Sequence, residues 1–139
     1  MDYKLEVVTL AVSDVDTALA FYTSLGFHLD VDYHPRDGFR VVQLTPPGSA
    51  CSIQFGAGLT DAAPGSARAS YLVVEDLEAA REELVARGIK VGDIRHKSPV
   101  AEWAGEFAPG SDPERRAYAS LADFADPDGN TWTLQEIRR

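Results

Sequence analysis

Residues 12–27 read VSDVDTALAFYTSLGF, and residues 74–89 read VEDLEAAREELVARGI, which repeats the same pattern 62 residues later. In each copy an apolar strand leads into an acidic turn, a helix and a glycine. Asp14 and Asp76 stand where a helix N-cap belongs, because their carboxylates can accept hydrogen bonds from the first backbone N–H groups. Gly26 and Gly88 stand where each helix ends, because glycine tolerates a left-handed backbone. The repeat predicts two copies of one strand–helix unit.

Turn-rich segments divide the rest of each half into further strands. After the first helix we expect strands over residues 27–33, 39–44 and 51–55. After the second helix we expect strands over residues 89–94, 118–124 and 131–137. Each half is then β-α-β-β-β. The prediction is a single domain, residues 1–139, made of a first module (1–56), a Gly/Ala/Pro-rich linker (57–66) and a second module (67–139).

The second module contains one long segment, residues 96–116, between its second and third predicted strands. Loops of this length without secondary structure are uncommon and are usually functional or disordered. Trp103 and Phe107 give this segment apolar side chains. Two alternatives therefore stay open, namely a mobile surface loop and a loop that docks over the mouth of a pocket.

Composition excludes several classes of partner. The chain has 22 acidic and 13 basic residues, a formal net charge of −9, which argues against nucleic-acid binding and against docking on anionic membranes. No apolar stretch approaches the roughly 18–20 residues needed to span a bilayer, and the first residues do not resemble a secretory signal. Cys51 is the only cysteine, so neither an intramolecular disulfide nor a cysteine zinc cluster can form. We expect a cytoplasmic protein.

Two motifs, together with the repeat, carry a resemblance to a known family. Residues 20–27 read AFYTSLGF and residues 124–130 read FADPDGN. With the paired modules, these motifs resemble the vicinal oxygen chelate superfamily, which includes glyoxalase I, extradiol dioxygenases and bleomycin-resistance proteins. The resemblance spans about residues 5–137. It implies an α+β fold in which two βαβββ modules form a curled eight-stranded mixed sheet around a cavity, with the helices on the outer faces.

The resemblance also implies where a catalytic metal would be bound. Metal-dependent relatives place a His or Glu on the first and last strand of each module. By spacing and by the repeat, those positions in this chain are Val7, Ser52, Ala69 and Thr133. None of them offers the imidazole, carboxylate or thiolate that holds a catalytic divalent ion. We therefore expect no metal and no other cofactor, and we expect the histidines at the surface or at strand edges.

Without a metal, the side chains that line the cavity are expected to carry the function. Strand residues alternate between the two faces of a sheet, so alternation selects the inward side chains. Gln54 and Gln135 are interpreted as amides at matching repeat positions, able to donate and accept hydrogen bonds toward a ligand. The candidate ligand-binding residues are Thr9, Gln43, Ser52, Gln54, Tyr71, His96, Trp103, Phe107, Thr133 and Gln135.

The favoured hypothesis is a metal-independent small-molecule-binding protein of the glyoxalase/bleomycin-resistance type. It would hold an organic ligand, for which an aromatic compound is one candidate, in the cavity between the modules. The acidic net charge is compatible with the cationic drugs that the bleomycin-resistance branch sequesters. A metal-free isomerase, cyclase or lyase is the alternative, and a metal-dependent glyoxalase or dioxygenase is a third, so whether the chain is an enzyme stays open. We expect a homodimer.

Overall fold

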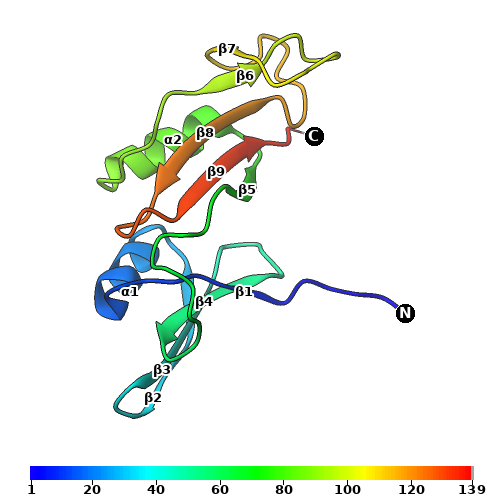
Figure 1. The fold of residues 1–139 in the computed structure, drawn as a ribbon. Coiled ribbons are helices and arrows are strands. Elements are labelled where there is room, and N and C mark those ends of the chain that lie inside the picture. Colours follow the sequence, from blue (N-terminus) through cyan, green and yellow to red (C-terminus); the bar gives the residue numbers. More distant parts are fainter. Residues whose placement is uncertain (139) are drawn as a thin grey trace. The chain divides into compact units, whose positions relative to one another are not determined.

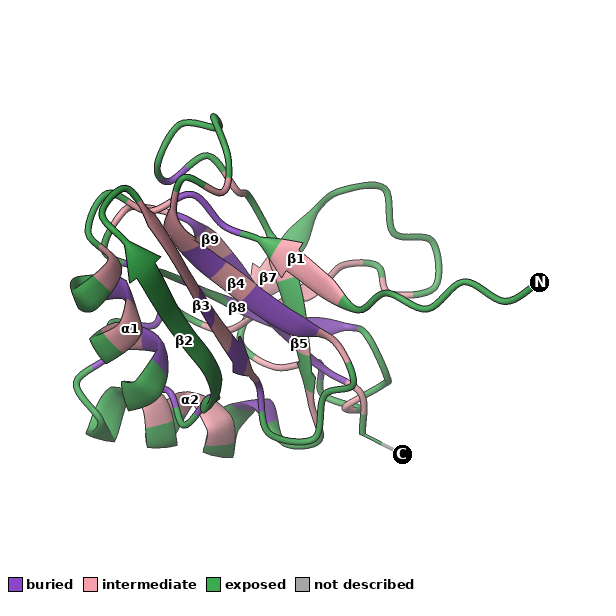
Figure 2. Ribbon diagram, turned by 90° about the horizontal axis from the view of Figure 1, so that it is seen from below, coloured by how far each residue is buried: buried purple, intermediate pink, exposed green. Residues whose placement is uncertain are grey.

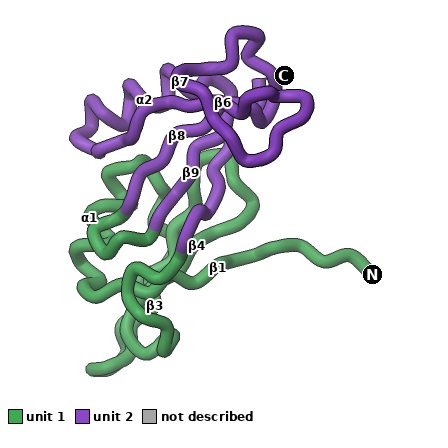
Figure 3. Tube along the Cα trace, turned by 45° about the horizontal axis from the view of Figure 1, so that its top comes forward, with its two compact units in different colours: residues 1–67, 126–130 green, residues 68–125, 131–139 purple. Residues whose placement is uncertain are grey.

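The computed structural model describes residues 1–138, which fall into two units coloured in Figure 3. Unit 1 consists of residues 1–67 and 126–130, and unit 2 of residues 68–125 and 131–138. Within the described residues, unit 1 contains β1 (Val7–Thr9), α1 (Val15–Ser24), β2 (His28–Arg36), β3 (Phe39–Thr45) and β4 (Ser52–Ala57). Unit 2 contains β5 (Ser70–Val74), α2 (Leu77–Ala86), β6 (Arg95–Lys97), β7 (Phe107–Pro109), β8 (Ser120–Ala125) and β9 (Thr131–Glu136).

The sheet of unit 1 has the strand order β1-β4-β3-β2, with β1 parallel to β4 and the other neighbours antiparallel (Figure 1). One face of this sheet packs against α1. On that face Tyr22 is fully buried, and the centroid of its ring is 5.6 Å from that of the Phe55 ring. Val42 and Leu44 are buried on the same face. β2 is exposed along its whole length, as Figure 2 shows. Apolar side chains therefore gather on the helix side of the sheet, which holds the core of unit 1.

The N-cap prediction is confirmed for both helices. The Asp14 carboxylate accepts a hydrogen bond from the Thr17 amide at 2.8 Å at the start of α1. The Asp76 carboxylate accepts one from the Ala79 amide at 3.1 Å at the start of α2. These bonds lower the pKa of each aspartate.

The turn 126–130 belongs to unit 1, although it joins two strands of unit 2 in the sequence. The Tyr22 hydroxyl donates to Asp126 Oδ2 at 2.8 Å. The Asn130 side-chain amide donates to the carbonyl of Ala11 at 3.0 Å, and the Ser13 amide donates to the carboxylate of Asp128 at 3.1 Å. The turn is thus held by the segment between β1 and α1 and by α1 itself.

The sheet of unit 2 has the strand order β5-β9-β8-β6-β7, with β5 parallel to β9. α2 packs on one face, where Trp132 and Leu134 are buried and the Trp132 ring stacks on Phe124. The buried Glu136 carboxylate accepts the Leu77 amide at 3.0 Å and pairs with the Arg115 guanidinium. Hydrogen bonding to Arg115 lowers the pKa of Glu136, against the opposing effect of burial.

The α+β class and the paired strand–helix units are confirmed, but the strands are arranged differently from the prediction. Nine strands in residues 1–138 form two sheets of four and five strands, rather than eight strands in one sheet. The segment 96–116, predicted to be a loop, contains the hairpin strand β7, and β6 begins at Arg95. Enclosure of a cavity by the two modules stays a prediction.

The predicted strand over residues 89–94 is reduced to a single bridge, between Val91 and Phe124. A side chain of α2 contacts this segment. The Arg81 guanidinium donates to the carbonyls of Gly92 at 2.8 Å and Val91 at 3.1 Å. Regular pairing with β8 starts only at Arg95. Neither helix in the part of the chain described has the length and apolar character that crossing a membrane requires.

Candidate functional site

The face of the unit 1 sheet that lies opposite α1, called here the open face of unit 1, carries three of the predicted residues in one row. Thr9 pairs with Gln54, and Gln54 pairs with Gln43, across β1, β4 and β3. Directly paired residues project on the same side of a sheet. The Gln54 side-chain amide donates to the Thr9 hydroxyl at 2.9 Å. This bond fixes the amide, so that its carbonyl oxygen is presented in one orientation.

Ser52 lies on the same open face, two residues before Gln54 along β4. Its hydroxyl is 2.6 Å from that of Thr45, which in turn donates to the carboxylate of Asp30. Ser52 is buried and Thr45 is half-buried. The polar groups of the open face of unit 1 therefore form two hydrogen-bonded sets, Thr9 with Gln54 and Ser52 with Thr45 and Asp30.

The open face of unit 2, opposite α2, carries Tyr71, Thr133 and Gln135. Tyr71 pairs with Thr133, and the Thr133 hydroxyl donates to the Asp123 carboxylate at 2.8 Å. The Gln135 amide donates to the carbonyl of Tyr118 at 3.0 Å. Tyr118 has a φ of 67°, which residues other than glycine rarely adopt. Thr133 and Gln135 are buried, whereas Tyr71 is exposed.

The interpretation of Gln54 and Gln135 as matching repeat positions is wrong. Thr9 and Tyr71 are matched by the repeat, and their partners on the neighbouring parallel strand are Gln54 and Thr133. Gln135 pairs with Val73, two residues further along. A slip of two residues keeps a side chain on the same face, whereas a slip of one would reverse it. Both amides therefore lie on open faces, although they do not correspond.

Trp103 and Phe107 join the open face of unit 2 through the β6–β7 hairpin. Phe107 pairs with Lys97, and its ring lies 5.4 Å from that of Trp103 between centroids. The Arg95 guanidinium lies 4.8 Å from the Phe107 centroid and donates to Asp123 at 2.9 Å. The Lys97 ammonium lies 4.8 Å from the Trp103 centroid. A continuous set of contacts therefore runs from Thr133, through Asp123, to the hairpin.

The sequence did not single out Arg95, Lys97 and Asp123 as site residues. Arg95 and Lys97 alternate onto the open face because β6 spans Arg95–Lys97. The predicted strand ended at residue 94, so this alternation was not applied to them. Asp123 was accessible to the same reasoning, since it pairs directly with Thr133 on an adjacent predicted strand.

His96 lies on the other face of β6 from Arg95 and Lys97, because it alternates with them along the strand. It pairs with the buried Ser120, and its Nδ1 is 2.8 Å from the carbonyl oxygen of Gly110. The structure therefore separates His96 from the other candidates of unit 2. Its ring is held by the backbone of the hairpin.

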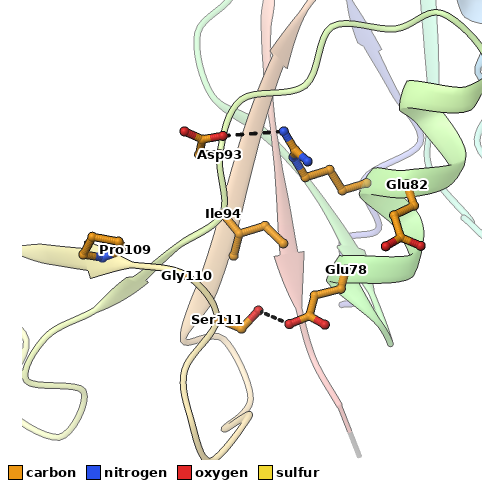
Figure 4. Close-up of a pocket in the computed structure, with 8 residues that line it drawn as sticks. Glu78, Glu82, Asp93, Ile94, Pro109, Gly110 and Ser111 are labelled. Carbon is orange, nitrogen blue, oxygen red and sulfur yellow. Dashed lines mark hydrogen bonds and ion pairs between the residues drawn. The ribbon is translucent and has the colours of Figure 1, made fainter.

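A groove of about 490 Å³ lies on the α2 side of unit 2, beside Gly110 (Figure 4). Its lining is mixed, with charged side chains beside Ile94 and Pro109. Arg81 pairs with Asp93 at 3.6 Å, and the Ser111 hydroxyl donates to Glu78 at 2.9 Å. None of the predicted ligand-binding residues lines this groove. The groove and the open face are therefore different features of unit 2.

The four positions that metal-dependent relatives use need one revision. The register of the strands matches Gln54, rather than Ser52, to Thr133. The positions are then Val7, Gln54, Ala69 and Thr133, which still include no imidazole, carboxylate or thiolate. Over residues 1–138 no group of three or more His, Cys, Asp or Glu side chains is arranged to hold a metal ion.

Comparison with known proteins identifies relatives over the whole chain. The family model of the Glyoxalase/Bleomycin resistance protein/Dioxygenase superfamily matches residues 4–134. TnmS3, an antibiotic binding protein from Streptomyces sp. CB03234, is 27% identical, with 98% of this chain and 97% of that chain covered and a TM-score of 0.72. No curated protein matches the sequence significantly.

Two further solved structures are similar to a comparable degree. A glyoxalase/bleomycin resistance protein from Streptomyces sp. CB03234 is 28% identical, with 96% of this chain and 100% of that chain covered and a TM-score of 0.69. A member of the same superfamily from Sphaerobacter thermophilus DSM 20745 is 26% identical, with 97% and 98% covered and a TM-score of 0.69.

Proposed function

Because the chain belongs to the Glyoxalase/Bleomycin resistance protein/Dioxygenase superfamily, we propose that it is a metal-independent protein that binds an organic small molecule. The ligand is held on the open face of unit 2, through the rings, hydroxyl and amide described above. We further propose that residues 1–139 act as one functional domain. The solved relative named as an antibiotic binding protein supports this class of function.

The observation that carries the proposal is the exposed apolar surface on the open face of unit 2. Tyr71 and Val73 on β5 are 55% and 53% exposed, and Trp103 and Phe107 on the hairpin are 40% and 42% exposed. Tyr71 and Val73 lie at the β5 edge of this sheet, and Trp103 and Phe107 lie at its β7 edge, so the exposed apolar surface occupies two parts of the face. Exposed apolar patches mark binding sites, because their exposure to water is unfavourable. Thr133 and Gln135 lie on that face as polar neighbours. Apolar walls with a few placed polar groups are typical of small-molecule sites.

Metal independence is supported by the donor set. Gln54 and Thr133 occupy places where metal-dependent relatives have a His or Glu, and an amide and a hydroxyl are poor ligands for a catalytic divalent ion. Purified protein is expected to contain no stoichiometric zinc, iron, nickel or manganese by elemental analysis. A stoichiometric metal whose removal by a chelator abolishes binding would contradict this part of the proposal.

The experiment that tests the function uses a panel of aromatic antibiotics. Binding is measured by calorimetry, and the ligand is then released and analysed by mass spectrometry. We expect binding by the intact chain and recovery of a chemically unchanged ligand. Recovery of an altered ligand would support a metal-free isomerase, cyclase or lyase instead. Failure of the whole panel to bind would contradict the proposal.

Two further parts of the proposal concern the state of the protein in the cell. We propose a homodimer in the cytoplasm, with no nucleic-acid partner. Sedimentation equilibrium measures the first point, and a monomer at micromolar concentration would contradict it. The net charge of −9 supports the absence of nucleic-acid binding.

A further inference from the structure

Two cations of the open face of unit 2 differ in how their charge is balanced. Arg95 donates to the Asp123 carboxylate at 2.9 Å, so a partner of opposite charge already neutralises it. Lys97 has its ammonium 4.8 Å from the centroid of the Trp103 ring. Within residues 1–138 Lys97 has no carboxylate at ion-pair distance. Of these two cations, Lys97 is therefore the one that can form an ion pair with an anionic group of a ligand.

The rings beside Lys97 supply a surface for a flat ligand. The Trp103 and Phe107 rings are 5.4 Å apart between centroids and inclined by 55°. A cation lies beside each ring. The Lys97 Nζ is 4.8 Å from the Trp103 centroid, and the Arg95 Cζ is 4.8 Å from the Phe107 centroid. Both rings remain about two-fifths exposed. A planar molecule resting on exposed ring surface here has the Lys97 ammonium within reach of a substituent.

We propose that this part of the open face recognises a planar aromatic anion, an aryl carboxylate or phenolate, with the ring against Trp103 and the anionic group on Lys97. The inference rests on the proposed function, because it names the ligand class that the same face takes. It departs from the expectation that an acidic chain suits cationic drugs. Charges farther than about 8 Å are largely screened at physiological ionic strength, so contacts at the face outweigh the net charge.

The anionic groups of the hairpin were considered in this assignment. Glu102 and Glu106 are exposed residues of the connection between β6 and β7. Neither forms an ion pair with Lys97 among the described residues. The Trp103 indole N–H donates to the carbonyl of Glu106, which fixes the ring without using a carboxylate. The charged group that contacts the Trp103 ring is therefore the Lys97 ammonium.

The test compares three probes of one shape and different charge: naphthalene-2-carboxylate, naphthalene-2-carboxamide and 2-naphthylmethylammonium. Their affinities for the full chain are measured by ligand-detected NMR titration. We expect the carboxylate to bind about three- to fivefold more tightly than the carboxamide, which is the range of an exposed ion pair. The preference should shrink as salt is raised.

Lys97→Gln should abolish the preference for the carboxylate over the carboxamide. Lys90→Gln removes an exposed lysine of unit 2 outside the hairpin and should leave the preference intact. Circular dichroism establishes that each variant is folded. A carboxylate that binds no better than the other probes, or a preference that survives in Lys97→Gln, would overturn the inference alone. Failure of all three probes to bind would overturn it and also count against the proposed function.

Discussion

At the scale of single residues, the buried carboxylate of Asp126 organises one end of unit 1. It accepts hydrogen bonds from the Tyr22 hydroxyl, from the amides of Asp128 and Asn130, and from the Asn130 side chain, at 2.8–2.9 Å. Four donors compensate for the removal of this carboxylate from water. Loss of the acceptor would leave several buried donors without a partner.

Replacement of this carboxylate is expected to be costly. Asp126→Ala should lower the free energy of unfolding by about 2–4 kcal/mol, and Tyr22→Phe by about 1–2 kcal/mol, because only one donor is lost in the second case. Tyr33→Phe removes the hydroxyl of an exposed tyrosine and serves as the control, with a change within about 0.5 kcal/mol. Urea unfolding measures all three. Equal stability of Asp126→Ala and the natural chain would contradict the argument.

Glu136 makes stability depend on pH in a defined direction. Its pKa is lowered by hydrogen bonding to Arg115, so the unfolded chain takes up a proton at this site before the folded chain does. The stability that Glu136 provides is complete above its ordinary pKa of 4.5 and is lost as pH falls through the lowered value. The pKa of Asp112 is lowered in the same direction, by Arg116.

Glu136→Gln should therefore reduce the slope of unfolding free energy against pH below about pH 5. At pH 7 it should cost about 3 kcal/mol, because Arg115 loses its buried partner. Glu102→Gln removes an exposed carboxylate and is the matched control. Unfolding by urea across pH 3–7 provides the measurement. A slope identical to that of the natural chain would show that Glu136 is not the group responsible.

At the scale of elements, the β6–β7 hairpin is expected to serve binding more than folding. Phe107 and Trp103 contact each other and two cations at its surface, rather than the buried core. Phe107→Ala and Trp103→Ala should each weaken binding of an aromatic ligand about fivefold to tenfold, on the scale of 1–1.5 kcal/mol for an aromatic pair. Their melting temperatures should fall by only a few degrees.

Tyr3→Ala is the control for these two variants, since Tyr3 is an exposed aromatic outside every strand. It should change neither affinity nor melting temperature. Calorimetric titration with the same ligand measures the affinities. Unchanged affinity in both hairpin variants would remove the hairpin from the binding face.

The sequence was sufficient to predict which side chains share a face, but not where every strand begins. Val42 and Leu44 are buried on the helix side while Gln43 lies on the open face, as alternation predicts. Alternation is a local property and needs no knowledge of the rest of the chain. The start of β6 at Arg95 is not a local property in this sense, and the contact of Arg81 of α2 with the carbonyl of Gly92 is one interaction that alternation does not reveal.

The register of neighbouring strands was equally beyond local reasoning. Ser52 and Thr133 were matched by the similarity of the letters around them, but the pairing of Thr9 and Tyr71 with their neighbours matches Gln54 to Thr133. Register is set by pairing across the sheet, which a single sequence does not contain. The cations Arg95 and Lys97 were missed because the predicted strand ended at residue 94, whereas β6 begins at Arg95.

At the scale of the whole molecule, the chain crosses between its two units at three places, after residues 67, 125 and 130. Unit 1 is therefore discontinuous in sequence. A fragment of residues 1–67 lacks the Asp126 carboxylate for Tyr22 and the Asn130 side chain for Ala11. Division of the chain at the repeat would separate these partners.

We expect the fragment 1–67 to be largely unfolded by circular dichroism and by proton NMR. A second fragment, 1–67 followed by a short Gly-Ser connection to residues 126–130, should recover part of the structure, because it restores the buried partners. The same second fragment with Asp126→Ala is the control and should recover less. A fully folded fragment 1–67 would show that the turn contributes little to unit 1.

The placement of residues 126–130 has a consequence for how such a gene can change over time. The two halves share one pattern, as expected after duplication, but the first copy now relies on five residues encoded within the second. Loss or separation of the second copy therefore removes residues on which the first copy depends. Recombination of a gene of this kind at residue 67 would separate residues 1–67 from residues 126–130, which complete their unit.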